Sequence, residues 1–166
     1  MTDIINQLAG IDDDSPIGRL RASRDISFNA AAGSYRELIT PDDPGGLSYI
    51  ERDAVALRVA LLEKSPAVAD HHRQRLLAAG ANHDLIAAIE QFPAERDRLD
   101  PHLETAIEHC DLLTTSPRDA SPNAIASLRG AGFSTRDIVS LSQLIAFVSY
   151  EVRLLSMMRI LQEEQA

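Results

Sequence analysis

Ser65, His71 and His72 carry the reactive groups of the run EKSPAVADHH, residues 63–72. Residues seven apart in a helix complete nearly two turns, so His72 is expected on the same face as Ser65. His71 should point about 100° away, so it cannot serve the same pocket. With Asp53 behind the histidine, these residue types could form a Ser-His-acid nucleophilic site, provided that the hydroxyl lies near the imidazole and an oxyanion pocket exists.

Each of these residues also has an ordinary structural explanation. Serine before proline at a helix start is what N-terminal capping selects, and we favour capping over nucleophilic catalysis for Ser65. Asp53 can be an acid near the start of its helix that interacts favourably with the helix dipole. His72 can be a satisfied core or surface histidine. The pattern therefore indicates a candidate site and leaves its reaction open.

Other polar side chains do not have the spacing of a metal site. His102 and His109 are seven apart and share a helix face, but no third ligand follows at a diagnostic interval. Cys110 lies between acids in the run EHCD, and nearby carboxylates raise the pKa of a thiol. We expect no metal and no cofactor, and a packing role for Cys110. The remaining side chains considered as metal ligands are Asp70, His71, His72 and His83.

Helix-start and helix-stop signals place the candidate residues on helices. Ala and Leu dominate the interior segments and strand signals are nearly absent, so the expected fold class is all-α. Ser48 with Glu51 has the spacing of a capping box and predicts a helix to about Lys64; Ser65-Pro66 predicts the next helix, which should stop at Gly80. Further helices are expected after Asn82, Asp100-Pro101, Ser121-Pro122 and Ser134.

A sequence pattern that occurs twice in the chain suggests a duplicated three-helix element. LLEKSP begins at Leu61 and LLTTSP at Leu112, and Ala-Gly turns at Gly80 and Gly132 follow at nearly the same interval. Each half then reads as helix, Ser-Pro, helix, Ala-Gly turn and helix. Repeated capping chemistry would give the same pattern, so both explanations stay open.

The last predicted helix, residues 134–162, is apolar on two sides. Two apolar flanks are more than one neighbour can cover, and a helix on the order of 43 Å long exceeds the width of a small domain. We therefore expect part of it to pack on another subunit of a homo-oligomer. The first flank is Ile138, Leu141, Ile145, Val148, Val152, Leu155 and Met158; the second is Phe147, Tyr150, Leu154, Met157 and Leu161.

Composition limits the classes of partner. The 166 residues, 45% of them apolar, suffice for one helical domain over 1–166, with residues 1–40 forming short helical pieces wrapped on its core. A formal charge of −9 opposes binding to nucleic acid or to anionic lipid surfaces. No apolar run long enough to cross a membrane and no signal segment is evident, so we expect a cytoplasmic protein. The single cysteine excludes a disulfide within the chain.

Several stretches together resemble a known family. LSYIERDAVALRVALLEKSPAVADHH, residues 47–72, is similar to a motif that reads approximately LS-x-x-ERE, an Ala-rich helix and a CPYCVAHH-type turn. LRGAGFSTRDIV and FVSYEVRL are similar to later segments with AAGFS and YFNFVNRL-type sequences. The chain thus resembles the carboxymuconolactone decarboxylase and alkylhydroperoxidase D-like superfamily, in particular its peroxidase-related branch, over about two thirds of its length.

The resemblance implies an all-helical core over 47–166, assembly into trimers or hexamers, and hydroperoxide reduction by a cysteine pair where the motif is intact. By this resemblance Ser65 stands at the first cysteine, Val68 at the second, His72 at the relay histidine and Asp53 at an acidic position that is glutamate in the family. A Cys-x-x-Cys pair stores electrons as a disulfide, and neither serine nor valine can do so.

Two functions are therefore compatible with the sequence, and both exclude dithiol peroxidase chemistry. In the first, His72 transfers protons on a small organic acid or lactone, with Asp53 orienting it. In the second, the site is degenerate and the chain is a non-catalytic binding or assembly partner of an active peroxidase-related relative. A closed, polar-tipped pocket joining the two residues would favour the first function. A filled site with an ion-paired acid and an exposed histidine would favour the second.

Overall fold

The computed structural model describes residues 3–164, and their secondary structure is helical with no strand among them. The predicted cap residues open most of the helices. Ser48 and Ser134 form complete capping boxes, and the Asn82 and Asp100 side chains accept from free backbone N–H groups. The helices that follow residue 47 are α4 Tyr49–Leu62, α5 Pro66–Ala78, α6 His83–Glu90, α7 Pro101–Thr115, α8 Pro122–Gly130 and α9 Thr135–Glu163.

The predicted stops at glycine are also present. Gly80 follows α5 with φ 88°, and Gly132 follows α8 with φ 101°. Both are left-handed conformations that a side chain would strain. Short 3-10 turns, η1 Arg96–Arg98 and η2 Pro117–Asp119, complete the connections.

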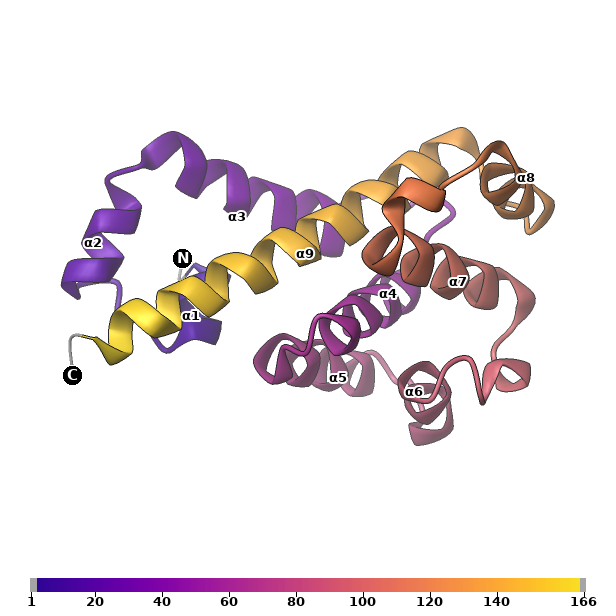
Figure 1. Cartoon of the computed structure of the whole chain (residues 1–166), viewed down its shortest axis with the longest axis horizontal. Helices are drawn as coiled ribbons and strands as arrows, with labels where there is room; N and C mark the ends of the chain where they lie inside the picture. Colours follow the sequence, from indigo (N-terminus) through magenta and orange to yellow (C-terminus); the bar gives the residue numbers. More distant parts are fainter. Residues whose placement is uncertain (1–2, 165–166) are drawn as a thin grey trace.

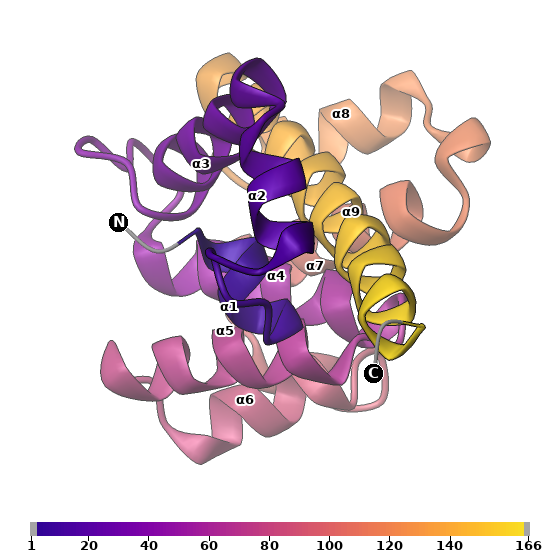
Figure 2. The same cartoon turned by 90° about the vertical axis from the view of Figure 1, so that its left-hand side faces the viewer.

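The core is built around α4. Ala54, Val55, Ala56, Leu57, Val59 and Ala60 are completely buried, and α4 packs against α5, α6, α7 and α9. An Ala-rich helix permits this, because small side chains let neighbours approach on every side. In Figure 2, α9 crosses the view diagonally, and α5 and α6 lie in the lower half of the molecule, below α4. The candidate residues of α4 and α5 thus lie at the most extensive contact between two helices in the described part of the chain.

Within the described residues, the N-terminal part of the chain forms three short helices. They are α1 Ile4–Ala9, α2 Pro16–Ala22 and α3 Asp25–Ile39. Figure 1 shows them beside the C-terminal part of α9, at the end of the molecule away from α6 and α8. Within residues 3–39, α1, α2 and α3 all pack on α9, α1 also contacts α5 and α3 also contacts α4, and Ala9, Ile17 and Ile39 belong to the hydrophobic core. The division of the chain into an N-terminal wrap and a core stays a prediction.

The loop between α3 and α4 is held by a buried arginine. The Arg52 guanidinium donates to the backbone carbonyls of Leu47, Leu38 and Pro44 at 2.9, 2.8 and 2.7 Å. Backbone oxygens satisfy donors that burial would otherwise leave without partners. Gly46 N–H donates to Asp137 on α9 at 2.9 Å, so the loop is fixed to two helices.

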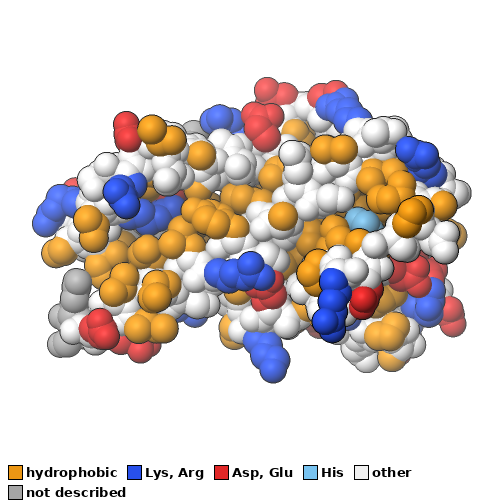
Figure 3. All heavy atoms as spheres, turned by 45° about the horizontal axis from the view of Figure 1, so that its top comes forward, with side chains coloured by type: hydrophobic (Ala, Val, Ile, Leu, Met, Phe, Trp, Pro, Cys, Tyr) orange, Lys and Arg blue, Asp and Glu red, His pale blue; other side chains and the backbone are white. Residues whose placement is uncertain are grey.

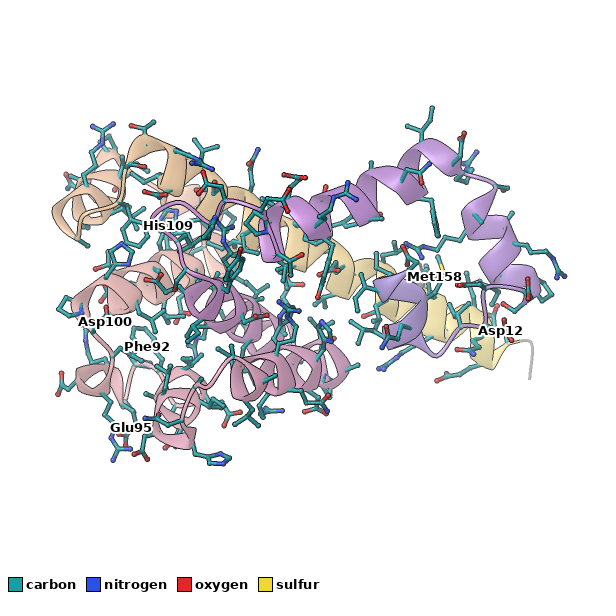
Figure 4. The ribbon with its side chains drawn as sticks, turned by 180° about the vertical axis from the view of Figure 1, so that it is seen from behind. Asp12, Phe92, Glu95, Asp100, His109 and Met158 are labelled. Atoms are coloured by element: carbon teal, nitrogen blue, oxygen red, sulfur yellow. The ribbon has the colours of Figure 1, made fainter. Side chains whose placement is uncertain are left out.

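The first predicted flank of α9 is mainly core, and the second is only partly covered. Ile138, Leu141, Ile145, Val148, Val152 and Leu155 are buried, whereas Tyr150 and Met157 are 43% and 54% exposed. On the face shown in Figure 3, hydrophobic side chains form an exposed band toward the left end, where α2, α3 and α9 meet. Figure 4 places Met158 at that end and His109 at the other.

By length and composition alone, α9 could cross a membrane. Its most apolar 18-residue window is 56% buried inside the protein, as in the core helix of a soluble domain. An average over a window tolerates scattered polar residues, so α9 passes this test although the sequence contains no uninterrupted apolar run of about 20 residues.

The two halves of the suggested repeat have the same order of elements but differ at the Ser-Pro step. Ser65-Pro66 opens α5 directly, whereas Ser116-Pro117 opens only η2, and the helix begins later at Pro122. Duplication stays a hypothesis.

Candidate functional site around His71 and His72

His72 and Asp53 face each other across the α4 and α5 interface. His72 Nδ1 lies 2.7 Å from Asp53 Oδ1, and the two residues are 0% and 2% exposed. Burial lowers the pKa of His72, so the imidazole is neutral near pH 7. Because the carboxylate oxygen accepts, Nδ1 carries the proton and Nε2 has a free lone pair. Nε2 is buried and has no hydrogen-bond partner among the described residues.

Arg75 completes a three-residue polar network. Its Nε donates to the same Asp53 oxygen at 2.7 Å. Asp53 is the fifth residue of α4 and points inward, so the interpretation as an acid of the first turn is wrong; Glu51 has that position. The sequence correctly pairs Asp53 with His72, but it gives no signal for Arg75.

Ser65 does not join this network. Its hydroxyl caps nothing: no side-chain bond to the start of α5 is present. The capping interpretation is therefore wrong. The physical reason is the backbone, because Ser65 has ψ 93°, whereas the serines that do cap α4 and α9 have ψ 163° and 166°. Ser65 instead lines a cavity of about 280 Å³ to which neither His72 nor Val68 contributes.

The structure thus does not form the Ser-His-acid arrangement. Ser65 precedes α5 and lines a cavity that His72 does not reach, and its extended backbone means that the seven-residue helical spacing does not apply to it. His72 is engaged by Asp53 through one nitrogen, and its other nitrogen has no partner among the described residues. Val68 is completely buried in the hydrophobic core. Position 68 has therefore become a packing position, without a polar or redox group.

His71 forms a hydrogen bond with Tyr35, a partner that the sequence does not indicate. Its Nε2 lies 2.8 Å from the Tyr35 hydroxyl on α3, and the rings of His71 and His72 are 5.0 Å apart. Burial lowers the pKa of His71 to about 4 and raises the pKa of Tyr35 to about 12, so the neutral tyrosine donates to the neutral imidazole. Tyr35 lies 36 residues from His71, and no motif links the two.

The other candidate residues have structural contacts. His102 bonds Glu51 and stacks on Phe133 with ring centroids 3.7 Å apart, and His109 lies 3.4 Å from Ser142 Oγ. Cys110 is fully buried, and that burial raises its pKa well above the ordinary value. Within residues 3–164, no group of three or more His, Cys, Asp or Glu side chains is arranged to hold a metal ion.

Comparison with known proteins bears on the fold. A peroxidase-related protein from Silicibacter sp. TM1040 superposes with a TM-score of 0.72 at 19% identity, over 81% of this chain and 69% of that one. A protein from Agrobacterium tumefaciens, proposed to be the antioxidant defence protein AhpD, gives 0.72 at 17% identity, over 84% and 92%. This chain has the AhpD-like fold.

A third structure agrees with this assignment. A peroxidase-related protein from Ralstonia eutropha JMP134 with an alkylhydroperoxidase AhpD core gives a TM-score of 0.62 at 17% identity, over 90% of this chain and 85% of that one. No protein-family model and no curated protein matches the sequence. The all-α AhpD-like prediction is confirmed as a fold, and at these identities the likeness extends no further.

Proposed function

We propose that this chain is a non-catalytic assembly subunit with an AhpD-like fold, located in the cytoplasm, and that it does not reduce hydroperoxides. Positions 65 and 68 carry serine and valine, so there is no sulfur pair to oxidise. The one thiol, Cys110, is buried and its pKa is raised, which leaves little thiolate to attack a peroxide.

The observation that carries this proposal is the burial of His72. The residue is 0% exposed, and its acid partner Asp53 also accepts from Arg75. Neither His72 nor Asp53 lines the cavity beside Ser65. The site matches neither expectation completely. Asp53 is ion-paired, as expected for the non-catalytic role, but His72 is buried, whereas that role predicted an exposed histidine. A buried, mutually paired network supports a structural role, since a substrate would have to displace packed side chains to reach it.

A hydroperoxide assay with a dithiol reductant tests the loss of redox chemistry. The wild-type chain should give no turnover above that of a Cys110→Ser variant, because no other sulfur nucleophile of cysteine type exists in the sequence. Robust turnover that disappears in Cys110→Ser would contradict the proposal.

One observation favours a second function. The unpartnered, unprotonated Nε2 of His72, with Nδ1 held by Asp53, is the arrangement of a general base, and it would suit proton transfer on a small organic acid or lactone. Under this function His72→Ala should abolish turnover of such substrates. Under the assembly function the same variant should leave self-association unchanged, which separates the two.

A further inference from the structure

A cavity of about 330 Å³ lies between α2, the start of α3 and the C-terminal half of α9. Part of its lining is a single stripe along α9, because the residues recur at intervals of three or four. At about 1.5 Å per residue, this stripe extends over about 16 Å. The cavity therefore suits an elongated apolar group better than a compact one. The stripe is Tyr150, Leu154, Met158 and Leu161, and Ile17, Leu20 and Phe28 complete the apolar lining.

The charged side chains at this cavity are arginines. Arg21 and Arg24 belong to the lining, and no acid is among the described lining residues, although the chain has a formal charge of −9. Arg21 is ion-paired with Asp3, and its guanidinium carbon lies 5.1 Å from the centre of the Phe28 ring. Arg24 has no ion pair among the described residues. The uncompensated charge at the cavity is therefore positive.

Two hydroxyl groups add hydrogen-bond donors. Ser27 and Tyr150 line this cavity and also a neighbouring one of about 780 Å³, so they mark the place where the two cavities adjoin. Figure 3 shows basic side chains beside the hydrophobic band at this end of the molecule. Apolar walls with a few polar groups are typical of a small-molecule site, and arginine with hydroxyl donors favours a carboxylate.

We propose that this cavity binds an aliphatic carboxylate of medium chain length, as in a fatty acid. The carboxylate lies at Arg24, next to Ser27, and the alkyl chain lies along the apolar stripe of α9. The sign of the charge identifies the head group, and the length of the stripe identifies the tail.

The ligand site does not depend on the assembly role, but the two would influence each other. The cavity lies on a flank of α9 that this chain leaves partly uncovered, and in an assembly a second copy would pack on that flank. The ligand and the second copy are alternative occupants, so saturating ligand should convert an oligomer into monomers. An oligomer that persists with ligand bound would contradict the shared surface. Ligand binding by a chain that is always monomeric would contradict only the assembly role.

Decanoate serves as the probe, with 1-decanol as its neutral counterpart and decylammonium as its cationic one, all below micelle-forming concentrations. Titrations of the full chain are followed by calorimetry and by NMR of ¹³C-labelled methionine methyl groups. Met158 lines the cavity, whereas Met157 is 54% exposed and lies outside the lining. Decanoate should shift the Met158 resonance more than that of Met157, and should bind about fivefold more tightly than decanol. Equal binding of decanol, tighter binding of decylammonium, or an unshifted Met158 resonance would each overturn the proposal.

Leu20→Asp tests the position of the site. Leu20 is 67% exposed and lines the cavity, so a carboxylate there should repel the ligand without disturbing the core. Decanoate affinity should fall by at least about tenfold while the melting temperature stays near that of the wild type. Ile26→Asp is the matched control, because Ile26 is 83% exposed and lies outside the lining, and it should leave affinity unchanged. Unchanged affinity in Leu20→Asp, or an equal loss in Ile26→Asp, would refute the site.

Arg24→Gln tests the head group separately. Decanoate affinity should fall by about fivefold and decanol affinity should not change, because only the carboxylate depends on the charge. Arg118→Gln removes an exposed arginine that is outside the lining and should affect neither ligand. An equal loss of decanol affinity in Arg24→Gln, or no loss of decanoate affinity, would contradict the assignment of a carboxylate.

Discussion

Burial shifts the pKa of two ionisable side chains, His72 and Glu151, away from their ordinary values. His72 stays neutral inside because burial outweighs the favourable Asp53 carboxylate. Glu151 on α9 is 1% exposed, its Oε1 has no partner among the described residues, and burial together with the nearby Asp3 carboxylate raises its pKa to about 8. Glu151 is therefore mostly protonated at neutral pH, and its burial is a cost that grows with pH.

Replacing Glu151 should show this cost directly. The unfolded carboxyl ionises near pH 4.5 and the folded one near pH 8, so the wild type loses stability as pH rises between these values. Glu151→Gln should equal the wild type near pH 4 and exceed it at pH 8 by on the order of 3 kcal/mol in urea unfolding. Glu163→Gln, on the exposed end of the same helix, is the control. A difference that does not vary with pH would contradict the displaced pKa.

Among individual residues, the sequence predicted the contact between His72 and Asp53 but did not predict the other polar contacts of the site. His72 and Asp53 were paired correctly because the resemblance places both at one site. Tyr35, Arg75 and Asp3 were missed because each belongs to a contact between helices distant in sequence or lacks a motif. Serine capping failed at Ser65 because capping depends on ψ, which the residue type does not determine.

At the scale of elements, the turn between α4 and α5 holds an unusual residue. Lys64 has φ 57°, a left-handed conformation that costs a side chain about 1–2 kcal/mol. Helix boundaries here were predicted well, because proline and the capping box act locally. The strained turn was not predicted, since lysine gives no signal for it.

Lys64→Gly should relieve this strain. Glycine adopts the left-handed conformation freely, although it adds entropy to the unfolded chain, so we expect a net gain of about 0.5–1 kcal/mol. The denaturant midpoint should rise with an unchanged slope. Lys64→Ala removes the same charge but keeps the strain, and should give no gain. A loss of stability in Lys64→Gly would show that the lysine side chain contributes more than its backbone costs.

At the scale of the whole molecule, the uncovered flank of α9 meets α2 and α3 in two adjoining cavities. These measure about 780 and 330 Å³ and share Ser27 and Tyr150. A second copy of the chain is the occupant we propose, because two copies of one apolar flank can pair with each other symmetrically. The fold class was predictable from helix signals, whereas the extent of this surface depends on how residues 3–39 pack.

Met157→Glu tests this interface. The side chain is 54% exposed, so a charge there should not disturb the single chain but should prevent an apolar contact between copies. Sedimentation should show an oligomer for the wild type and a monomer for the variant. Val139→Glu places the same charge on an equally exposed site elsewhere on α9 and should keep the oligomer. A wild type that is monomeric at all concentrations would contradict self-association.

The single lysine also has a practical consequence. Reagents that couple proteins to a sensor surface through primary amines can attach this chain at only one side chain, and that side chain borders the cavity at the start of α5. A chip that holds the chain through Lys64 would cover the rim of this cavity and turn the start of α5 toward the sensor surface. Immobilisation through a terminal tag leaves the start of α5 uncovered.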